Sequence, residues 1–436
     1  MDTISDLPDC ILLHILSFLP TKTAFLTTVL SRRWTHLCHD LQHLHFEENQ
    51  FRNRNPWSGF IAKKRFLDIV NRILSRHKAP PIRTFRLTWD LNQSDEYTLE
   101  GFIRKVLGPN LEELNLQLSS ICCSGPKVVI PNGVFSCTSL VTLRLNGGHI
   151  RIPSPSAPSC GYHLPSLKTL QLYNVIASDG NKLVEILSHC TALETLILDS
   201  VCLYSLEVQL SICFPSLKSL HFKSHLGETL RLLVIDTPSL KRLDIQVASR
   251  FHEIRVRNLH NVEEARINIS KQSSVLGFLV ELCRIRILEL GLSTIYCLPE
   301  VPPHRIPELT CLQRLELTVR CLDTRYIMNM LRKCPMLKLL AIVFILSVPR
   351  MDPDPWEHPV QVPTCLASHL QVIEIKRYFE SRDDRDFFAY VLQHGLVLES
   401  LDIQVDDTIS KGFPEELSLL PRSSKACQIN FCYLYV

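Results

Sequence analysis

Three stretches of the chain repeat one pattern: residues 165–172 (PSLKTLQL), 215–222 (PSLKSLHF) and 238–245 (PSLKRLDI). In each, a proline and a serine precede apolar residues spaced as L-x-x-L-x-L. The final apolar–polar–apolar triplet has the period of two that is typical of a β-strand with one buried face. The proline ends the preceding element and directs the chain into the strand. Such a repeated unit predicts strands stacked side by side around a continuous core.

The same pattern recurs along most of the chain, with starts about 26 residues apart, inside the leucine-rich-repeat range of roughly 20–29. The further strong copies are Leu111-Leu114-Leu116, Leu140-Leu143-Leu145, Leu193-Leu196-Leu198, Val262-Ala265-Ile267, Ile285-Leu288-Leu290, Leu312-Leu315-Leu317 and Leu337-Leu340-Ile342. Weaker outer copies are Ile82-Phe85-Leu87, Leu370-Ile373-Ile375 and Leu398-Leu401-Ile403. The sequence therefore predicts an α/β solenoid, an irregular leucine-rich-repeat horseshoe, over residues 80–350.

The segments between the strands favour this solenoid over a parallel β-helix, its main rival. Residues 180–189 and 324–333 have the length and pattern of helical spacers, which β-helices seldom contain. The repeats resemble irregular plant leucine-rich repeats but lack the usual asparagine after the strand. The corresponding residues are Ser119, Gly148, Val175 and Val201. We therefore expect no ordered asparagine ladder. Cysteines three residues before a repeat leucine (Cys137, Cys190, Cys334) are expected to be compact buried wedges.

Residues 4–41, ISDLPDCILLHILSFLPTKTAFLTTVLSRRWTHLCHDL, predict a small helical unit. A first helix should run over about residues 8–18 and stop at Pro20, a second over about 23–30, and a third should begin after the capping residue Ser31. About 40 residues cannot bury all of this apolar surface alone. The leftover apolar faces indicate either a docking module or a helical cap on the repeats, and both interpretations stay open on the pattern alone.

This segment closely resembles the F-box of the large plant F-box family. The matching residues are Leu7-Pro8-Asp9, Ile15-Leu16-Ser17-Phe18-Leu19-Pro20, Val29-Leu30-Ser31-Arg32-Arg33-Trp34 and Leu37, within a predicted domain over residues 1–47. The resemblance implies that the segment binds a Skp-type adaptor, which links to a cullin. It also implies which residues contact the adaptor or hold its contacts in place: Leu7, Pro8, Ile11, Leu12, Ile15, Leu16, Leu19, Pro20, Val29 and Trp34. Cys38 stands where the family often has a second tryptophan.

Residues 355–432 resemble the FBD domain that ends many plant F-box proteins. The matching residues include Val362-Pro363, Cys365-Leu366, Ile373-Glu374-Ile375, Tyr390-Val391-Leu392, Leu398-Glu399-Ser400-Leu401 and Cys427-Gln428-Ile429-Asn430-Phe431. The family's glycine-acidic element is replaced here by residues 379–384. We expect this segment to extend the solenoid by about two units and to protect its last strand edge. Proline-rich breaks at 151–163 and 348–363 should be surface segments.

Composition excludes several classes of protein. The 436 residues carry a formal net charge of +3 with no long block of one sign, which gives no electrostatic reason to expect nucleic acid or an anionic membrane as partner. The acidic start and the lack of a long apolar run predict neither a signal peptide nor a membrane span. The 17 cysteines contain no CxxC pair and are expected to be reduced thiols in a cytoplasmic or nuclear protein.

No catalytic motif stands out, since GxSxG, P-loop, HExxH and GxGxxG are all missing from the sequence. His36, His39 and His43, with Cys38 beside them, could converge on a metal ion. A helix end near Asp40 would divide them, however, so ordinary junction residues are the favoured interpretation. We expect no metal, no cofactor and no catalysis.

The polar positions that alternate with the repeat leucines should form one exposed face of the strands. Charges of both signs are interspersed there, which suits a protein partner better than a polyphosphate. The candidate substrate-binding residues on this face are Arg144, Tyr173, Lys223, Arg242, Arg266 and Arg314. The alternative is a solvated face without a dedicated ligand.

Taken with the two resemblances, these features predict a non-catalytic substrate receptor of a Skp–cullin–F-box ubiquitin ligase. The F-box would dock the adaptor, and the repeats would hold a protein substrate. Two alternatives remain: a binding scaffold whose partners are not degraded, and a solenoid carbohydrate hydrolase, which needs two carboxylates about 5–10 Å apart in a cleft.

Overall fold

The computed structural model divides the chain into two compact units: unit 1 comprises residues 1–210 and 227–231, and unit 2 comprises 211–226 and 232–436. The structure describes residues 4, 6–51, 59–77, 81–91, 95–120, 128–147, 150–153, 161–177, 180–203, 208–224, 230–247, 253–298, 301–322, 324–345, 361–378, 384–405 and 412–433. None of the helices in these ranges is both long enough and apolar enough to cross a membrane.

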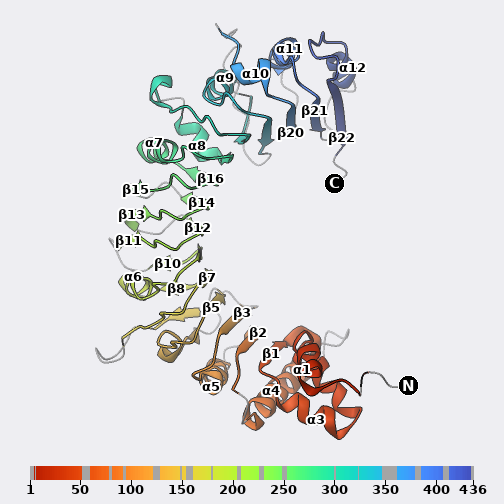
Figure 1. Cartoon of the computed structure of the whole chain (residues 1–436), viewed down its shortest axis with the longest axis vertical. Coiled ribbons are helices and arrows are strands. Elements are labelled where there is room, and N and C mark those ends of the chain that lie inside the picture. The colour runs from red at the N-terminus through yellow and green to blue at the C-terminus, as the bar shows by residue number, and fades with distance from the viewer. Residues whose placement is uncertain are drawn as a thin grey trace. The chain divides into compact units, whose positions relative to one another are not determined.

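Unit 1 begins with short helices and continues as a stack of strands (Figure 1). The helical elements are α1 (Asp9–Ser17), α2 (Thr21–Leu26), η1 (Thr27–Val29), α3 (Arg32–His39), η2 (Glu48–Phe51), α4 (Gly59–Arg76), α5 (Glu96–Val106), η4 (Asn132–Val134) and α6 (Gly180–Ser188). The main strands pair in parallel in the order β1 (His43–Glu47), β2 (Thr84–Leu91), β3 (Glu113–Ser120), β5 (Thr142–Asn146), β7 (Thr169–Tyr173) and β9 (Thr195–Asp199). A second small parallel sheet holds β4 (Val128–Val129), β6 (Ile150–Ile152), β8 (Ile176–Ala177) and β10 (Cys202–Leu203).

The chain passes into unit 2 within β11 (Val208–Ile212). The main strands of unit 2 are again parallel and follow in the order β12 (Ser219–Ser224), β14 (Arg242–Val247), β16 (Glu264–Ile269), β17 (Ile287–Leu290), β18 (Arg314–Val319), β19 (Leu339–Phe344), β20 (Val372–Tyr378), β21 (Ser400–Val405) and β22 (Gln428–Tyr433). Separately, β13 (Leu230–Asp236) pairs with β15 (Glu253–Arg257). The helical elements are α7 (Gln272–Glu281), α8 (Leu292–Cys297), η5 (Pro303–Arg305), α9 (Thr324–Arg332), α10 (Thr364–Ser368), α11 (Asp384–His394) and α12 (Phe413–Ser418).

The repeat leucines build the core of both units. Every apolar position of the predicted L-x-x-L-x-L copies is buried. The strands keep one register, so that Leu288 lies between Ala265 and Leu315 and each column of apolar side chains continues from strand to strand. Each fully buried aliphatic side chain stabilises the fold by roughly 1.5–3 kcal/mol relative to exposure. The predicted α/β solenoid class is therefore confirmed.

The strand stack reaches beyond the predicted repeats at both ends. Next to the helical segment, β1 adds a strand whose apolar residues Leu44 and Phe46 are buried against β2. At the other end, β20, β21 and β22 continue the sheet, and with α11 and α12 between them they form about two strand–helix units and a final strand. Helix α12, between β21 and β22, was not predicted. The predicted spacers over residues 180–189 and 324–333 are the helices α6 and α9.

Several local expectations need correction or fall outside the described residues. The second helix begins at Thr21 rather than near residue 23, because Pro20 acts as its N-cap instead of only ending α1. No asparagine ladder was expected after the strands. At two of the corresponding positions the structure has the buried valines Val175 and Val201. Three further expectations fall mostly or wholly outside the described residues: the proline-rich breaks at 151–163 and 348–363, the replaced element at 379–384, and Gly148.

The cysteines before the repeat strands behave as small core residues. Cys190 and Cys334 are fully buried, whereas Cys137 is half-buried. Burial raises the pKa of the Cys190 thiol to about 12 and that of Cys365 also to about 12. The deprotonated, nucleophilic form of these thiols is therefore suppressed at neutral pH.

Alkylation of the folded protein should separate buried from exposed cysteines. At a pH near 8, iodoacetamide should label the exposed Cys283 and Cys311 quickly, while Cys190, Cys334 and Cys365 should react only after denaturation. Peptide mass spectrometry of native and urea-denatured samples measures this difference. Equal labelling of Cys190 and Cys283 in the native sample would contradict the described core.

Candidate functional site

Helix α1 divides its residues among three faces. Leu12 and Leu16, one turn apart, are 0% and 1% exposed and fill the core of the helical segment. Ile11 and Ile15, also one turn apart, remain 44% and 43% exposed. A monomer gains nothing by presenting these two isoleucines to water, so this face is a candidate contact surface for another protein.

Further large apolar side chains of the helical segment also face solvent. They are Ile4, Phe18, Leu26, Val29 and Leu30, with exposed fractions between 54% for Ile4 and 83% for Val29. Leu26, Val29 and Leu30 have the i, i+3, i+4 spacing of one helical face. The segment therefore does not hide its apolar surface against the repeats.

The ten predicted adaptor-binding residues fall into three groups by exposure. Ile11, Ile15, Val29 and Pro8 are exposed and available for contact, while Leu7, Leu19 and Pro20 are half-buried. Leu12, Leu16 and Trp34 are buried in the core of the helical segment, on which the exposed residues rest. Phe18, Leu26 and Leu30 are exposed as well but are not among the predicted residues, because a helical pattern alone does not tell which of two apolar faces points inward.

An arginine that is not among the ten predicted adaptor-binding residues fixes the start of α1. The Arg33 guanidinium donates to Asp9 Oδ1 from Nε at 2.8 Å and from Nη2 at 2.6 Å, and Nη2 also donates to the carbonyl oxygen of Leu7 at 2.5 Å. This contact ties α3 to the turn that carries Leu7 and Pro8. Arg33 is therefore a positioning residue for the exposed face of α1.

The helical segment also protects the free edge of the first strand. The backbone N–H of His45 in β1 donates to Thr21 Oγ1 at 2.7 Å, and Thr21 is 1% exposed. The Lys22 ammonium donates to the carbonyl oxygen of Gln50 just after β1. An open strand edge invites unwanted pairing, so these contacts make the segment a cap for unit 1. The two interpretations that the sequence left open, cap and docking module, are compatible.

Replacing Thr21 by valine should test this cap. The Thr21→Val side chain keeps the shape but leaves the His45 N–H without its acceptor, which should lower the free energy of unfolding by about 1–3 kcal/mol. Urea unfolding followed by circular dichroism measures the change. The matched control is Thr23→Val on the exposed side of α2, which should change stability little. Equal effects of the two substitutions would refute the capping role.

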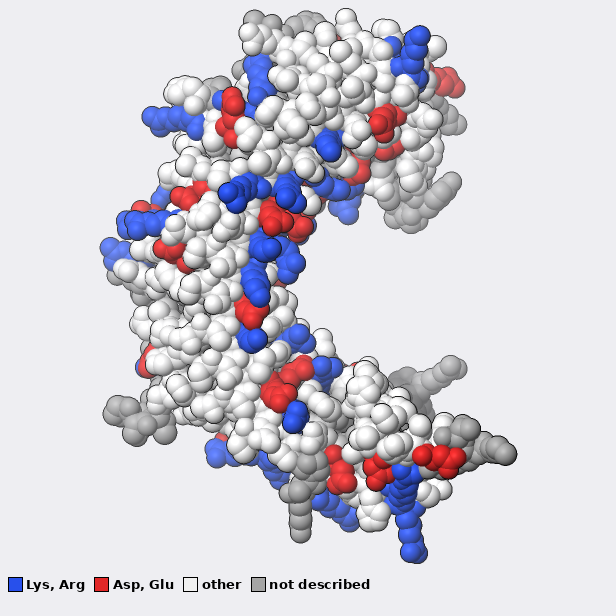
Figure 2. Space-filling view, viewed as in Figure 1, with Lys and Arg blue, Asp and Glu red and all other residues white. Residues whose placement is uncertain are grey.

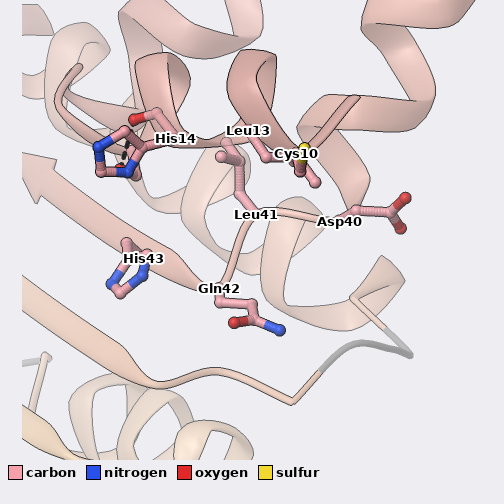
Figure 3. A pocket seen from close by; sticks show the side chains of 8 residues that line it. Cys10, Leu13, His14, Asp40, Leu41, Gln42 and His43 are labelled. Atoms are coloured by element: carbon pink, nitrogen blue, oxygen red, sulfur yellow. Dashed lines mark hydrogen bonds between the residues drawn. The ribbon is translucent and has the colours of Figure 1, made fainter. Parts of the chain in front are cut away.

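The third face of α1 lines a pocket of about 630 Å³. In Figure 3, Cys10, Leu13 and His14 project from α1 toward the turn between α3 and β1. The remaining lining residues are Ser17, Asp40, Leu41, Gln42 and His43. The His14 ring packs edge-on against Phe18, with ring centroids 4.8 Å apart, so the rim of the pocket adjoins the exposed apolar residues of α1.

Cys38, His39 and His43, three of the four residues that could have bound a metal, have separate partners. Cys38 is buried and its thiol donates to the carbonyl oxygen of Ala24, while the His39 ring packs against Phe25. His43 Nδ1 lies 3.0 Å from Thr84 Oγ1 on the neighbouring strand. Within the part of the chain that the structure describes, no group of three or more His, Cys, Asp or Glu side chains is arranged to hold a metal ion.

In unit 1, the polar face of the strands carries a small ion-pair group. Arg86 donates to both carboxylate oxygens of Glu113, and Arg144 lies 3.6 Å from the same carboxylate. Tyr173, one strand beyond Arg144, is half-buried, and burial together with the neighbouring Asp199 raises the pKa of its hydroxyl. Arg144 and Tyr173 thus lie on the predicted face, but Arg144 is partly neutralised by Glu113.

In unit 2, the four remaining candidates also alternate with buried residues. Arg242 is exposed and Lys223 half-buried. Arg266 donates to Glu289 at 2.5 Å, and Arg314 contacts Glu316 at 3.2 Å. Figure 2 shows basic and acidic side chains interspersed over the molecule, without a large area of one sign in this view. The structure places these residues on one strand face, and their role in substrate binding remains a prediction.

Comparison with known families now gives these surfaces a context. Residues 4–46 match the model of the F-box domain, residues 99–295 match the leucine-rich-repeat model described as "FBD-associated F-box protein At5g56370, LRR repeats", and residues 357–403 match the FBD model. The three matches follow each other along the chain in that order. The chain belongs to the plant F-box/FBD/LRR family.

Individual relatives align over nearly the whole length of this F-box/FBD/LRR protein. The Arabidopsis thaliana FBD-associated F-box protein At4g10400 is 29% identical, with 99% of this chain and 100% of the relative covered. The F-box/FBD/LRR-repeat protein At5g56420 of the same plant is 28% identical, with 99% of each chain covered. The exposed faces of α1 and of η1 thus lie in the F-box, and the domains together support a substrate-recognition role.

Proposed function

We propose that this protein is the substrate-recognition subunit of a Skp–cullin–F-box ubiquitin ligase. The observation that carries the proposal is the apolar surface of the F-box, where Ile11, Ile15 and Val29 remain exposed although the same segment has a complete core of its own around Leu12 and Leu16. A Skp-type adaptor would cover this surface and link the protein to a cullin.

The division of α1 into a buried and an exposed face explains how docking would work. Leu12 and Leu16 fix the helix in the F-box core, and Arg33 fixes its first turn, so the exposed isoleucines are held in place before the adaptor arrives. A preorganised surface loses little conformational entropy on binding. The pocket beside His14 and Phe18 would offer a recess for an adaptor side chain next to the apolar contact.

The repeats would hold a protein substrate near the ligase's conjugating enzyme. In this role the chain contributes proximity and orientation rather than bond chemistry, and it is not itself an enzyme. The proposed location is the cytoplasm, the nucleus or both, where the thiols of the chain would stay reduced. A scaffold that docks the adaptor without degradation of its partner is the alternative, and accumulation of bound partners on depletion of this protein would separate the two.

Adaptor capture tests the proposal directly. The double variant Ile11→Asp/Ile15→Asp places two charges on the exposed face of α1 without touching the core, so the protein should fold but bind purified adaptor at least about tenfold more weakly. Surface plasmon resonance with immobilised adaptor measures the affinity. Leu16 would be a poor choice for substitution, because it is 1% exposed and a charge there would unfold the F-box.

A matched control comes from a residue far along the chain. Val280, on α7 of unit 2, is 61% exposed, so Val280→Asp adds an equivalent charge outside the F-box. This variant should bind the adaptor like the unmodified protein. Unchanged adaptor affinity in the Ile11→Asp/Ile15→Asp variant would sink the proposal.

The positioning role of Arg33 predicts a graded effect. Arg33→Ala should weaken adaptor binding less than the isoleucine double variant, because it loosens the turn at Leu7 without removing apolar contact area. Asp9→Ala should add little to Arg33→Ala in a double-mutant cycle, since both substitutions break the same contact. Full additivity of the two effects on adaptor affinity would show that Arg33 acts independently of Asp9.

A further inference from the structure

The polar face of unit 2 contains one strand that is entirely apolar. On β19, Leu339, Ala341 and Val343 alternate with the core residues and so point to the polar face. Their register partners on β18 and β20 include charged side chains, with Ala341 lying between Glu316 and Glu374. Leu339 and Val343 are half-buried, and the neighbouring Val372 of β20 is half-buried too. An apolar strip thus lies next to charged side chains of the neighbouring strands.

Four charged side chains form a closed arrangement over this strip, which we call the β19 bridge: Arg314, Glu316, Glu374 and Lys376. Within β18, Arg314 contacts Glu316 at 3.2 Å, and within β20, Lys376 contacts Glu374 at 3.2 Å. Across the intervening strand, Arg314 reaches Glu374 at 3.9 Å and Lys376 reaches Glu316 at 3.9 Å. Strands two apart in a sheet are separated by roughly 9.5 Å, so only long side chains over a small residue can meet.

Ala341 is the small residue that permits this meeting. It is 0% exposed although it points to the polar face, whereas Leu339 and Val343 on either side of it are half-buried. The β19 bridge therefore consists of charges held in place beforehand, with apolar side chains on both flanks. Apolar side chains bordered by charges that are already held in place correspond to the apolar centre and polar rim of a protein interface.

The charges of the face indicate what kind of partner fits. From β16 to β21 the polar face carries the carboxylates Glu264, Glu289, Glu316, Glu374 and Asp402 and the cations Arg266, Arg314 and Lys376. Each of the three cations already contacts a carboxylate of the same face. A carboxylate has about four acceptor positions. Asp402 accepts from the neutral donors Ser400 and Asn430. The face therefore has spare acceptors for a basic partner.

We propose that the β16–β21 face of unit 2 binds a basic protein segment that carries an aliphatic or aromatic side chain beside Lys or Arg. The apolar side chain packs on Leu339 and its register partner Val372, and the partner's cations contact Glu374 and Asp402. This inference rests on the proposed function and deepens it, because it names the class of substrate that the receptor holds. An anionic partner such as a nucleic acid or a phosphorylated segment is disfavoured by the same charges.

Peptide selection on the full-length protein tests the inference without the adaptor. The probe is a library of random dodecapeptides displayed on phage, selected on the unmodified protein and counted by sequencing. Peptides that bind should be enriched in Lys and Arg next to Leu, Ile, Phe or Trp. Their recovery should fall about tenfold or more on Leu339→Asp/Val343→Asp, which places charges on the apolar strip.

Two further variants keep the result interpretable. Leu396→Asp adds a charge at an exposed leucine in the turn between α11 and β21 and should leave recovery unchanged. Glu374→Lys/Asp402→Lys reverses the charge of the face without touching the strip and should shift the selected peptides toward acidic sequences. Circular dichroism and adaptor affinity should stay unchanged in all variants, which separates a failure of this site from a failure of the F-box.

Two outcomes would overturn the inference. One is a set of selected peptides rich in Asp and Glu, or one without charge preference, on the unmodified protein. The other is a basic set whose recovery survives both Leu339→Asp/Val343→Asp and Glu374→Lys/Asp402→Lys, because binding would then occur elsewhere on the chain. Neither outcome would affect the adaptor experiment, which depends on the F-box alone.

Discussion

A typical repeat strand of this protein buries one row of side chains, and the core exists because neighbouring strands keep the same register. Leu288 is buried because Ala265 and Leu315 lie beside it, and the other repeat leucines within each unit are buried in the same way. A core built in this way has no natural end. The first strand needs protection at its free edge, and unit 1 obtains it from the F-box, where Thr21 accepts the hydrogen bond of the His45 backbone.

The F-box protects the edge of the first strand and still leaves an apolar surface exposed to solvent. Helix α1 packs Leu12 and Leu16 inward and presents Ile11 and Ile15 outward, and α2 supplies the contact with β1. One short segment thus caps the repeats and keeps the apolar surface through which, as proposed, it docks the adaptor. A substitution that damages the cap should lower the free energy of unfolding as well as adaptor binding. A substitution on the exposed face should lower adaptor binding alone.

The polar faces of the strands are organised by pairing of charges, whereas the core is organised by packing of apolar side chains. Their cations are matched with carboxylates on neighbouring strands, as Arg86 is with Glu113 and Arg266 with Glu289. Exposed pairs of this kind add little stability, typically below about 1 kcal/mol each. Their value lies in holding charges at defined places, and this is clearest in the β19 bridge, where Arg314 and Lys376 each reach across a strand.

The sequence by itself determined the strands, because a buried leucine column imposes a period of two that any single repeat displays. It also determined the family through the F-box and FBD motifs, and it placed the six candidate substrate residues on the polar face. Only the tertiary structure decided which apolar residues of α1 point outward, since Ile11 and Leu12 are chemically alike and differ only in what packs on them. It alone showed that Ala341 lies beneath four charged side chains, because the strands that bring them together are separated by long stretches of chain.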